Sequence, residues 1–232
     1  DDGGLTIFDA RSGDSLQQIT KCHRGRVTCI VVGKAFIFTA GDDGAVRVWA
    51  ARSLEFVSQF SEHSKPVTGL LADNVHDNLL HSCSLDRSVI TYDLKNQKRH
   101  NFKSHKDGGF TGMCQRLDSE QELLTSTTDG FVLSWDCDVT NPVMALDCGR
   151  RMRFTCAAIS SGGRFVAVGC EDYCLRVWDV QTAEVVALCV GHSSNINAVA
   201  WSPDEKQLIS VGEEGAQCVW NFYLGGMDSE RD

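Results

Sequence analysis

The stretch TAGDDGAVRVW (Thr39–Trp49) holds a hydroxyl, acids, glycines and an indole within eleven residues. His23 stands sixteen residues before Thr39, so the side-chain types of a hydrolytic triad are all present. Two interpretations are open: the cluster reacts with a substrate, or it holds a fold together through hydrogen bonds. A reactive triad depends on one converging geometry, whereas a structural network can recur along a chain. The number of copies therefore decides between the two interpretations.

The stretch recurs at intervals of 41 to 43 residues along the 232-residue chain. Internal repetition at such a period is the signature of a repeat architecture. The aromatic residues that end the repeats are Phe8, Trp49, Tyr92, Trp135, Trp178 and Trp220. An acid stands six residues before each of them: Asp2, Asp43, Asp86, Asp129, Asp172 and Glu214.

Two further side-chain types follow the same period. Hydroxyls stand ten residues before the aromatic in most repeats, at Thr39, Ser82, Thr125 and Ser210. Histidines precede the first apolar run at His23, His63, His105 and His192. The fourth full repeat lacks both, with Val168 in place of the hydroxyl and GRRMRF in place of the histidine. Losing both partners of a buried hydrogen bond can be nearly neutral, whereas losing one leaves a buried group unpaired, so the pattern favours a structural network.

Within each repeat, short runs rich in Val, Ile, Phe and Thr alternate with turns of Gly, Asp, Asn and Ser. Such runs predict β-strands, and no stretch carries the capped amphipathic pattern of a helix. We expect an all-β chain with four strands in each repeat. The first full repeat illustrates them with Val27–Val32, Ala35–Ala40, Val46–Ala50 and Phe56–Phe60.

The histidine, hydroxyl, acid and terminal Trp-Asp at these offsets resemble the WD40 repeat, and the resemblance spans Leu5 to Phe222. It implies a β-propeller of four-stranded antiparallel blades around a central channel. It also implies that Trp, hydroxyl, His and acid form a hydrogen-bonded tetrad in each blade. Tyr92 departs from this pattern because a phenol cannot replace an indole N–H, and one extra residue after His105 alters the third tetrad. The implied tetrad residues are His23, Thr39, Asp43 and Trp49; His63, Ser82, Asp86 and Tyr92; His105, Thr125, Asp129 and Trp135; Asp172 and Trp178; and His192, Ser210, Glu214 and Trp220.

The repeat boundaries predict four complete and two partial blades. Residues 1–22 supply the last two strands of a preceding blade, residues 23–62, 63–104, 105–149 and 150–191 each form a blade, residues 192–224 form a final blade without its outer strand, and residues 225–232 form a disordered tail. The resemblance implies that these blades are the C-terminal part of a seven-bladed ring. A five-bladed ring, in which Ser15–Ile19 completes the last blade, ranks second because it leaves Leu5–Asp9 redundant.

Composition narrows the function classes. A net charge of −9 and a pI near 5.2 argue against nucleic-acid binding, because phosphate contacts need an excess of Lys and Arg. No apolar run approaches the roughly 18 residues of a membrane span, so we expect no membrane insertion. The eleven cysteines are mostly inside apolar runs and read as reduced core thiols; even Cys170 and Cys174 lack zinc-finger spacing. We expect no catalytic residue, metal or cofactor.

We therefore expect a non-catalytic scaffold that binds proteins or peptides on the propeller faces, as a cytoplasmic subunit of a larger intracellular assembly, with cytoskeletal or ciliary association left open. The alternative is a substrate-receptor subunit, for example of a ubiquitin ligase. A propeller enzyme is less favoured because the histidines recur blade by blade. The family commonly receives peptides on its narrow top face, which here would carry Arg24, Arg26, Asp42, Lys65, Lys106, Arg151, Arg153, Glu171 and Glu213.

Overall fold

The computed structural model describes residues 3–73, 76–115, 122–136, 139–147 and 153–223. Arg151 and the tail predicted at residues 225–232 lie outside these ranges. In the part of the chain that is described, no helix is long and apolar enough to cross a membrane. The strands are β1 (Leu5–Phe8), β2 (Ser15–Ile19), β3 (Val27–Val32), β4 (Phe36–Gly41), β5 (Val46–Ala50), β6 (Phe56–Phe60), β7 (Val67–Ala72), β8 (Leu79–Ser84), β9 (Ser88–Asp93), β10 (Lys98–Ser104), β11 (Phe110–Gln115), β12 (Glu122–Thr127), β13 (Phe131–Asp136), β14 (Met144–Asp147), β15 (Phe154–Ile159), β16 (Phe165–Cys170), β17 (Cys174–Asp179), β18 (Glu184–Val190), β19 (Ile196–Trp201), β20 (Gln207–Gly212) and β21 (Gln217–Asn221).

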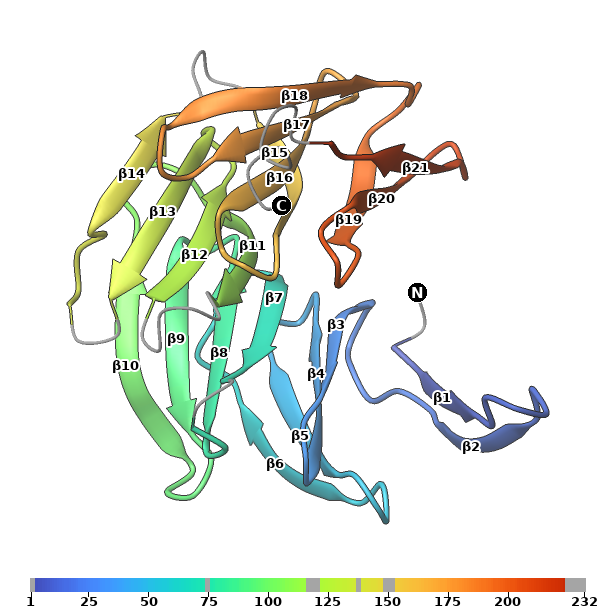
Figure 1. Cartoon of the computed structure of the whole chain (residues 1–232). Helices are drawn as coiled ribbons and strands as arrows, with labels where there is room; N and C mark the ends of the chain where they lie inside the picture. Colours follow the sequence, from blue (N-terminus) through green and yellow to red (C-terminus); the bar gives the residue numbers. More distant parts are fainter. Residues whose placement is uncertain (1–2, 74–75, 116–121, 137–138, 148–152, 224–232) are drawn as a thin grey trace, which may run out of the picture.

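Consecutive strands pair antiparallel into six sheets, which confirms the predicted blades. Strands β1 and β2 form the first sheet, β19 to β21 form the last, and the four sheets between them have four strands each. Figure 1 shows the sheets arranged around a common centre, with β3, β7, β11, β15 and β19 innermost. A hollow of about 530 Å³ at this centre is lined by residues of these five strands.

The hydrophobic core lies between neighbouring blades. Alternation along each strand gives both faces of a blade apolar side chains, and each face packs on the next blade. Phe38 and Val48 of one blade, for example, share a buried cluster with Leu70 and Leu80 of the next. Burying a side chain of this size contributes about 1.5–3 kcal/mol. The four four-stranded blades each have a neighbour on both sides, so the stack holds their polar turns in a fixed position.

A β-bulge recurs at the start of each inner strand, because the pairing register shifts after the first residue of β3, β7, β11, β15 and β19. Bulges re-aim the side chain of the extra residue. At three of these positions the residue is a threonine that donates a hydrogen bond to the following blade. Thr28 donates to the Val67 carbonyl at 2.6 Å, Thr68 to the Phe110 carbonyl at 2.8 Å, and Thr155 to the Ile196 carbonyl at 2.6 Å.

Thr155→Val is expected to destabilise the protein by about 1 kcal/mol, because the Ile196 carbonyl loses its donor while the side-chain volume hardly changes. Chemical denaturation of the intact protein measures this difference. Thr182→Val, at an exposed turn position, is the control and should stay within about 0.5 kcal/mol of the wild type. Equal effects of the two substitutions would show that the threonine bond does not hold the blades.

Candidate functional site

The first full blade brings its four predicted tetrad residues together. His23 precedes β3, Thr39 lies on β4, Asp43 lies in the turn before β5, and Trp49 lies on β5. The Thr39 hydroxyl oxygen accepts the Trp49 indole N–H at 3.0 Å and lies 2.9 Å from Nε2 of His23. Nδ1 of His23 lies 2.9 Å from Oδ1 of Asp43. These contacts join the segment before β3, the strands β4 and β5 and the turn between them into one unit.

Burial sets the protonation states of this unit. It lowers the pKa of His23, although the neighbouring Asp43 offsets part of that effect. Burial alone would raise the pKa of Asp43, but the Arg24 backbone N–H, His23 and Arg47 together hold it well below its usual range. A neutral imidazole can donate from Nδ1 to the carboxylate and accept at Nε2 from the hydroxyl. The imidazole proton and the hydroxyl proton therefore both take part in hydrogen bonds inside the blade.

The last blade repeats the arrangement. Ser210 accepts the Trp220 indole N–H at 2.8 Å and lies 2.7 Å from Nε2 of His192. Glu214 takes the place of the aspartate and lies 2.5 Å from Nδ1 of His192. The Ser194 hydroxyl and then His192 lower the pKa of Glu214 to about 2. The longer acid thus reaches the same imidazole nitrogen as the aspartate of the first full blade.

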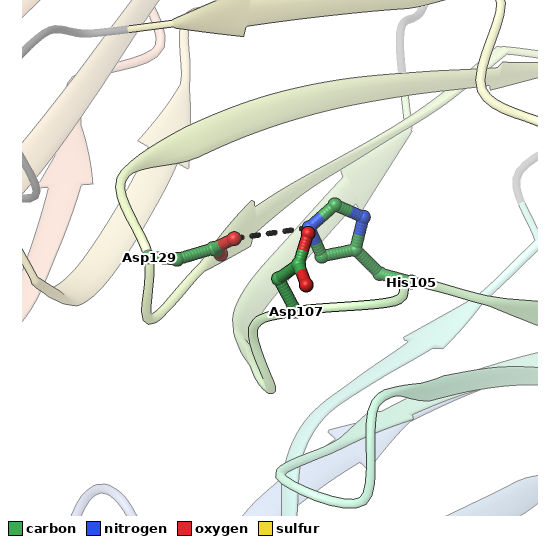
Figure 2. Close-up of side chains that lie close together, drawn as sticks. All are labelled: His105, Asp107 and Asp129. Carbon is green, nitrogen blue, oxygen red and sulfur yellow. Dashed lines mark hydrogen bonds and ion pairs between the residues drawn. The ribbon is translucent and has the colours of Figure 1, made fainter.

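The third tetrad is brought together only in part, and here the structure corrects the expectation. His105 presents Nε2 to Oδ2 of Asp129 at 3.1 Å, the opposite ring nitrogen from the other blades. Thr125 accepts the Trp135 indole N–H at 2.8 Å, but within the described ranges no hydrogen bond joins it to His105. The extra residue before β11 turns the ring away. Figure 2 shows that Asp107 lies close to His105 and Asp129 instead.

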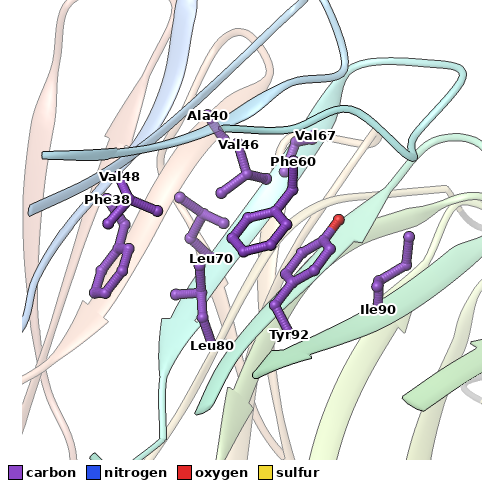
Figure 3. Packing of buried hydrophobic residues seen from close by; sticks show 10 residues of the cluster. All are labelled: Phe38, Ala40, Val46, Val48, Phe60, Val67, Leu70, Leu80, Ile90 and Tyr92. Atoms are coloured by element: carbon purple, nitrogen blue, oxygen red, sulfur yellow. The ribbon is translucent and has the colours of Figure 1, made fainter. Parts of the chain in front are cut away.

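The second blade keeps the imidazole but not the indole. His63 lies 2.7 Å from the Ser82 hydroxyl and 2.9 Å from Asp86. Tyr92 stacks on Phe60 at 4.2 Å between ring centroids (Figure 3), and its buried hydroxyl has no hydrogen-bond partner in the described part of the chain. Burial raises the pKa of Tyr92, and the nearby Ser82 hydroxyl offsets part of that rise without meeting hydrogen-bond geometry. Tyr92 therefore acts as a packing residue.

The fourth blade replaces the imidazole by an ion pair. Both oxygens of Asp172 accept from the Arg176 guanidinium, at 2.9 and 2.6 Å. The Arg176 side chain is the largest influence on the pKa of Asp172 and lowers it. Trp178 is buried against Phe154, at 6.0 Å between ring centroids. A bidentate pair supplies the directional contact that the tetrads supply elsewhere.

The predicted top face divides into local pairs and one pocket. Arg26 pairs with Asp42 at 3.0 Å, Arg153 pairs with Glu171 at 3.3 Å, and Glu213 accepts from Asn195 at 3.3 Å. Arg24 uses its backbone N–H on Asp43, and Lys106 offers its carbonyl to Arg87. A pocket of about 380 Å³, here called the basic pocket, is lined by Lys65, Leu85, Arg87, Asp107, Gly109, Thr128 and Arg153. Three blades thus line one concave surface, and two of them supply its cations, Lys65 and Arg87 from the blade of β7 to β10 and Arg153 from the blade of β15 to β18.

Comparison with known proteins identifies the family. A model described as "WD domain, G-beta repeat" matches residues 14–50, 54–93, 145–179 and 183–221. The chain belongs to the WD40 repeat family. The matched segments leave out residues 94–144, which hold strands β11, β12 and β13 of the blade with the turned His105.

Similar proteins carry the same repeats. The chain is 27% identical over 226 residues to cilia- and flagella-associated protein 52 of Mus musculus, and 28% identical over 227 residues to the protein of that name from Chlamydomonas reinhardtii. These alignments cover 96% and 95% of this chain and 36% of each relative. It is also 23% identical to WD repeat-containing protein 55 homolog of Dictyostelium discoideum, over 96% of this chain and 54% of that protein. The chain thus spans about a third of the cilia- and flagella-associated relatives.

Arg87 is a pocket residue that the WD40 pattern did not single out. It follows the acid in the β8–β9 turn and has φ of 72°. The equivalent residues Gly44, Gly130 and Gly215 also have positive φ, as does Tyr173. A side chain in this left-handed region is strained, whereas glycine is not. An arginine where three other blades have glycine is the sequence signal that would have identified it.

The sequence pattern also failed to indicate a buried row of hydrogen-bonded side chains outside the WD40 tetrads, formed by Thr91, His81 and Asp73. Nδ1 of His81 lies 2.9 Å from the Thr91 hydroxyl, and Nε2 lies 2.9 Å from Oδ2 of Asp73. Gln115 of the next blade donates to the same carboxylate oxygen at 3.3 Å. The order hydroxyl, imidazole, carboxylate is that of a hydrolase triad, but His81 is 0% exposed and Thr91 is 5% exposed. A substrate cannot reach these atoms, so the row links two blades.

Proposed function

We propose that the protein is a non-catalytic interaction scaffold, a cytoplasmic WD40 subunit of a larger assembly that binds an acidic segment of a partner protein in the basic pocket. The observation that carries this proposal is the convergence of Lys65 and Arg87 from one blade and Arg153 from the next blade but one on one concave surface. A rigid scaffold that presents such residues on turns is suited to recognition. Clustered cations favour acidic or phosphorylated peptides.

The charges of the pocket are available to a ligand. No ion pair engages the Lys65 ammonium within the residues that the structure describes. The pair of Arg153 with Glu171 is exposed, so it stabilises the free protein little and can be exchanged for a ligand carboxylate. The Arg87 guanidinium donates to the Lys106 carbonyl at 2.9 Å, which holds the side chain over the neighbouring blade.

The imidazoles support a non-catalytic function. His23, His63 and His192 are buried, and each ring nitrogen of each residue has a protein partner. None of these rings has an open nitrogen with which to transfer a substrate proton. The names of the two cilia- and flagella-associated relatives favour a ciliary or flagellar assembly as the place where this scaffold acts.

The test is binding of a fluorescent Asp/Glu-rich peptide to the intact protein, measured by anisotropy. The double variant Lys65→Glu/Arg153→Glu is expected to bind at least about tenfold more weakly, a difference of about 1.4 kcal/mol, because two attractive charges become repulsive. Arg87→Gly should also weaken binding while relieving the strained φ, so its stability should not fall. Affinity should decrease with rising salt.

The matched control is Tyr173→Gly, which makes the same backbone change in the equivalent turn of another blade, outside the basic pocket. It should leave peptide affinity unchanged. Equal affinity in the wild type and the charge-reversed variant would overturn the proposal. So would equally tight binding of a Lys-rich peptide.

A further inference from the structure

The third blade has one more residue between its histidine and its inner strand than the other blades with a histidine. Three residues stand between His23 and Val27, between His63 and Val67 and between His192 and Ile196, whereas four stand between His105 and Phe110. The extra residue lies in the segment Lys106–Gly109. It places Asp107 beside the imidazole and turns the ring so that Nε2 faces Asp129. The blade has lost its imidazole–hydroxyl bond and has gained a second carboxylate.

Three potential ligand atoms meet at this point. The donor atoms of His105, Asp107 and Asp129 all lie within 4.8 Å of one another, and Figure 2 shows the three side chains directed toward a common space. They come from the loop before β11 and the turn before β13. Gly108 allows the close approach, because a Cβ there would lie 1.8 Å from Oδ1 of Asp129. A larger residue at that position would close the space.

Asp129 carries a buried oxygen that the protein does not satisfy. Its Oδ1 has no partner with hydrogen-bond geometry in the described part of the chain, although the Thr127 hydroxyl and the backbone N–H of Asp129 lie near the carboxylate. The equivalent acids elsewhere use both oxygens. Asp43 accepts from His23 and Ala45 on one oxygen and from Arg24 and Arg47 on the other. A buried carboxylate oxygen left without a partner carries a large desolvation cost, which a bound cation would remove.

We propose that His105, Asp107 and Asp129 form a binding site for a divalent transition-metal ion, with Zn²⁺ as the best match. An imidazole nitrogen with two carboxylate oxygens is a donor set that zinc accepts, and a fourth position remains for water or for a donor of a partner. Calcium requires six to eight oxygen ligands, and imidazole is not among them. Asp107 is exposed, so its side chain can rotate to bring its oxygen to bonding distance.

A simple hydrogen bond from His105 to Asp129 is the competing explanation. The single Nε2–H of His105 can serve Oδ2 of Asp129, where the contact is 3.1 Å, but it leaves Oδ1 without a partner. A metal ion can satisfy the carboxylate as a whole. The cations of the adjacent basic pocket, which Asp107 also lines, will make the affinity lower than that of a closed structural zinc site. The metal site shares Asp107 with the basic pocket, but the proposal of a metal site does not rest on the proposed peptide binding.

The test is titration of the intact, metal-free protein with Zn²⁺, followed by equilibrium dialysis and metal analysis. We expect one ion per chain at this site and a rise in the melting temperature on adding Zn²⁺. Asp107→Asn should weaken Zn²⁺ binding at least about tenfold without changing the stability of the metal-free protein, because the side chain is exposed. Asp129→Asn should do the same to binding. Asp172→Asn, which changes the equivalent acid of the fourth blade, is the matched control and should leave binding unchanged.

Cobalt substitution distinguishes the proposed ligands from cysteine. Co²⁺ held by one imidazole and two carboxylates should show no thiolate charge-transfer band. Three results would overturn the proposal: no stoichiometric Zn²⁺ binding, binding that is the same in Asp107→Asn and Asp129→Asn as in the wild type, or a thiolate band in the Co²⁺ protein. The first result would leave the hydrogen bond between His105 and Asp129 as the explanation of the cluster.

Discussion

Thr39→Val is expected to lower the free energy of unfolding by about 2–5 kcal/mol. The Thr39 oxygen serves two buried groups at once, the Trp49 indole N–H at 3.0 Å and Nε2 of His23 at 2.9 Å. Valine keeps the shape but leaves both groups unpaired, at about 1–3 kcal/mol each. Because His23 also holds Asp43, the turn before β5 should loosen as well. Denaturant unfolding of the intact protein measures the change.

Thr125→Val is the matched control for this substitution. Thr125 occupies the same position in the third blade, where the Trp135 indole N–H at 2.8 Å is its one side-chain partner among the described residues, because His105 is turned away. One stranded group in place of two predicts about half the loss of stability. A loss in Thr125→Val as large as that in Thr39→Val would contradict the assignment of the hydroxyl as a shared acceptor.

The fold was predictable because it depends on side-chain types at fixed offsets. The structure places β3, β5 and β6 at the residues predicted for the first full blade, and β4 begins at Phe36 where Ala35 was expected. Strands of this kind are defined by local alternation and by turn residues, both of which are readable in the sequence. The bulges were not predicted, since a register shift depends on the partner strand.

The candidate sites were less predictable because they depend on the path of loops and on neighbouring blades. The extra residue after His105 indicated that the third tetrad is altered, but it did not indicate the direction in which the ring turns. The basic pocket joins Lys65, Arg87 and Arg153, which are far apart in sequence and meet only in the ring. The row of His81 with Asp73 and Thr91 occurs in one blade, so no period could indicate it.

The tetrads also make the stability depend on pH. Burial lowers the pKa of His23, so its neutral form is favoured, and stability falls as the pH decreases below the unfolded value of 6.5 toward the folded pKa. Hydrogen bonds hold the pKa of Asp43 below its unfolded value of 3.8, so its contribution is present above that pH and is lost only as the pH falls through the folded pKa. The free energy of unfolding should therefore fall in two pH ranges, one below pH 6.5 and one below pH 3.8.

Asp43→Asn separates the two ranges and is expected to cost about 2–3 kcal/mol at pH 8. The asparagine cannot accept from the Arg24 N–H, the Arg47 guanidinium and His23 together. Because Asp43 partly raises the pKa of His23, its loss lowers that pKa further, so the difference from the wild type should widen between pH 6.5 and about 4. Below pH 3.8 the wild type loses the carboxylate contribution, and the difference should close.

The control is Asp77→Asn, at an exposed acid paired with Lys34, which should differ from the wild type by less than about 1 kcal/mol at every pH. A difference in Asp43→Asn that stays constant from pH 8 to pH 3 would mean that the carboxylate does not hold the imidazole.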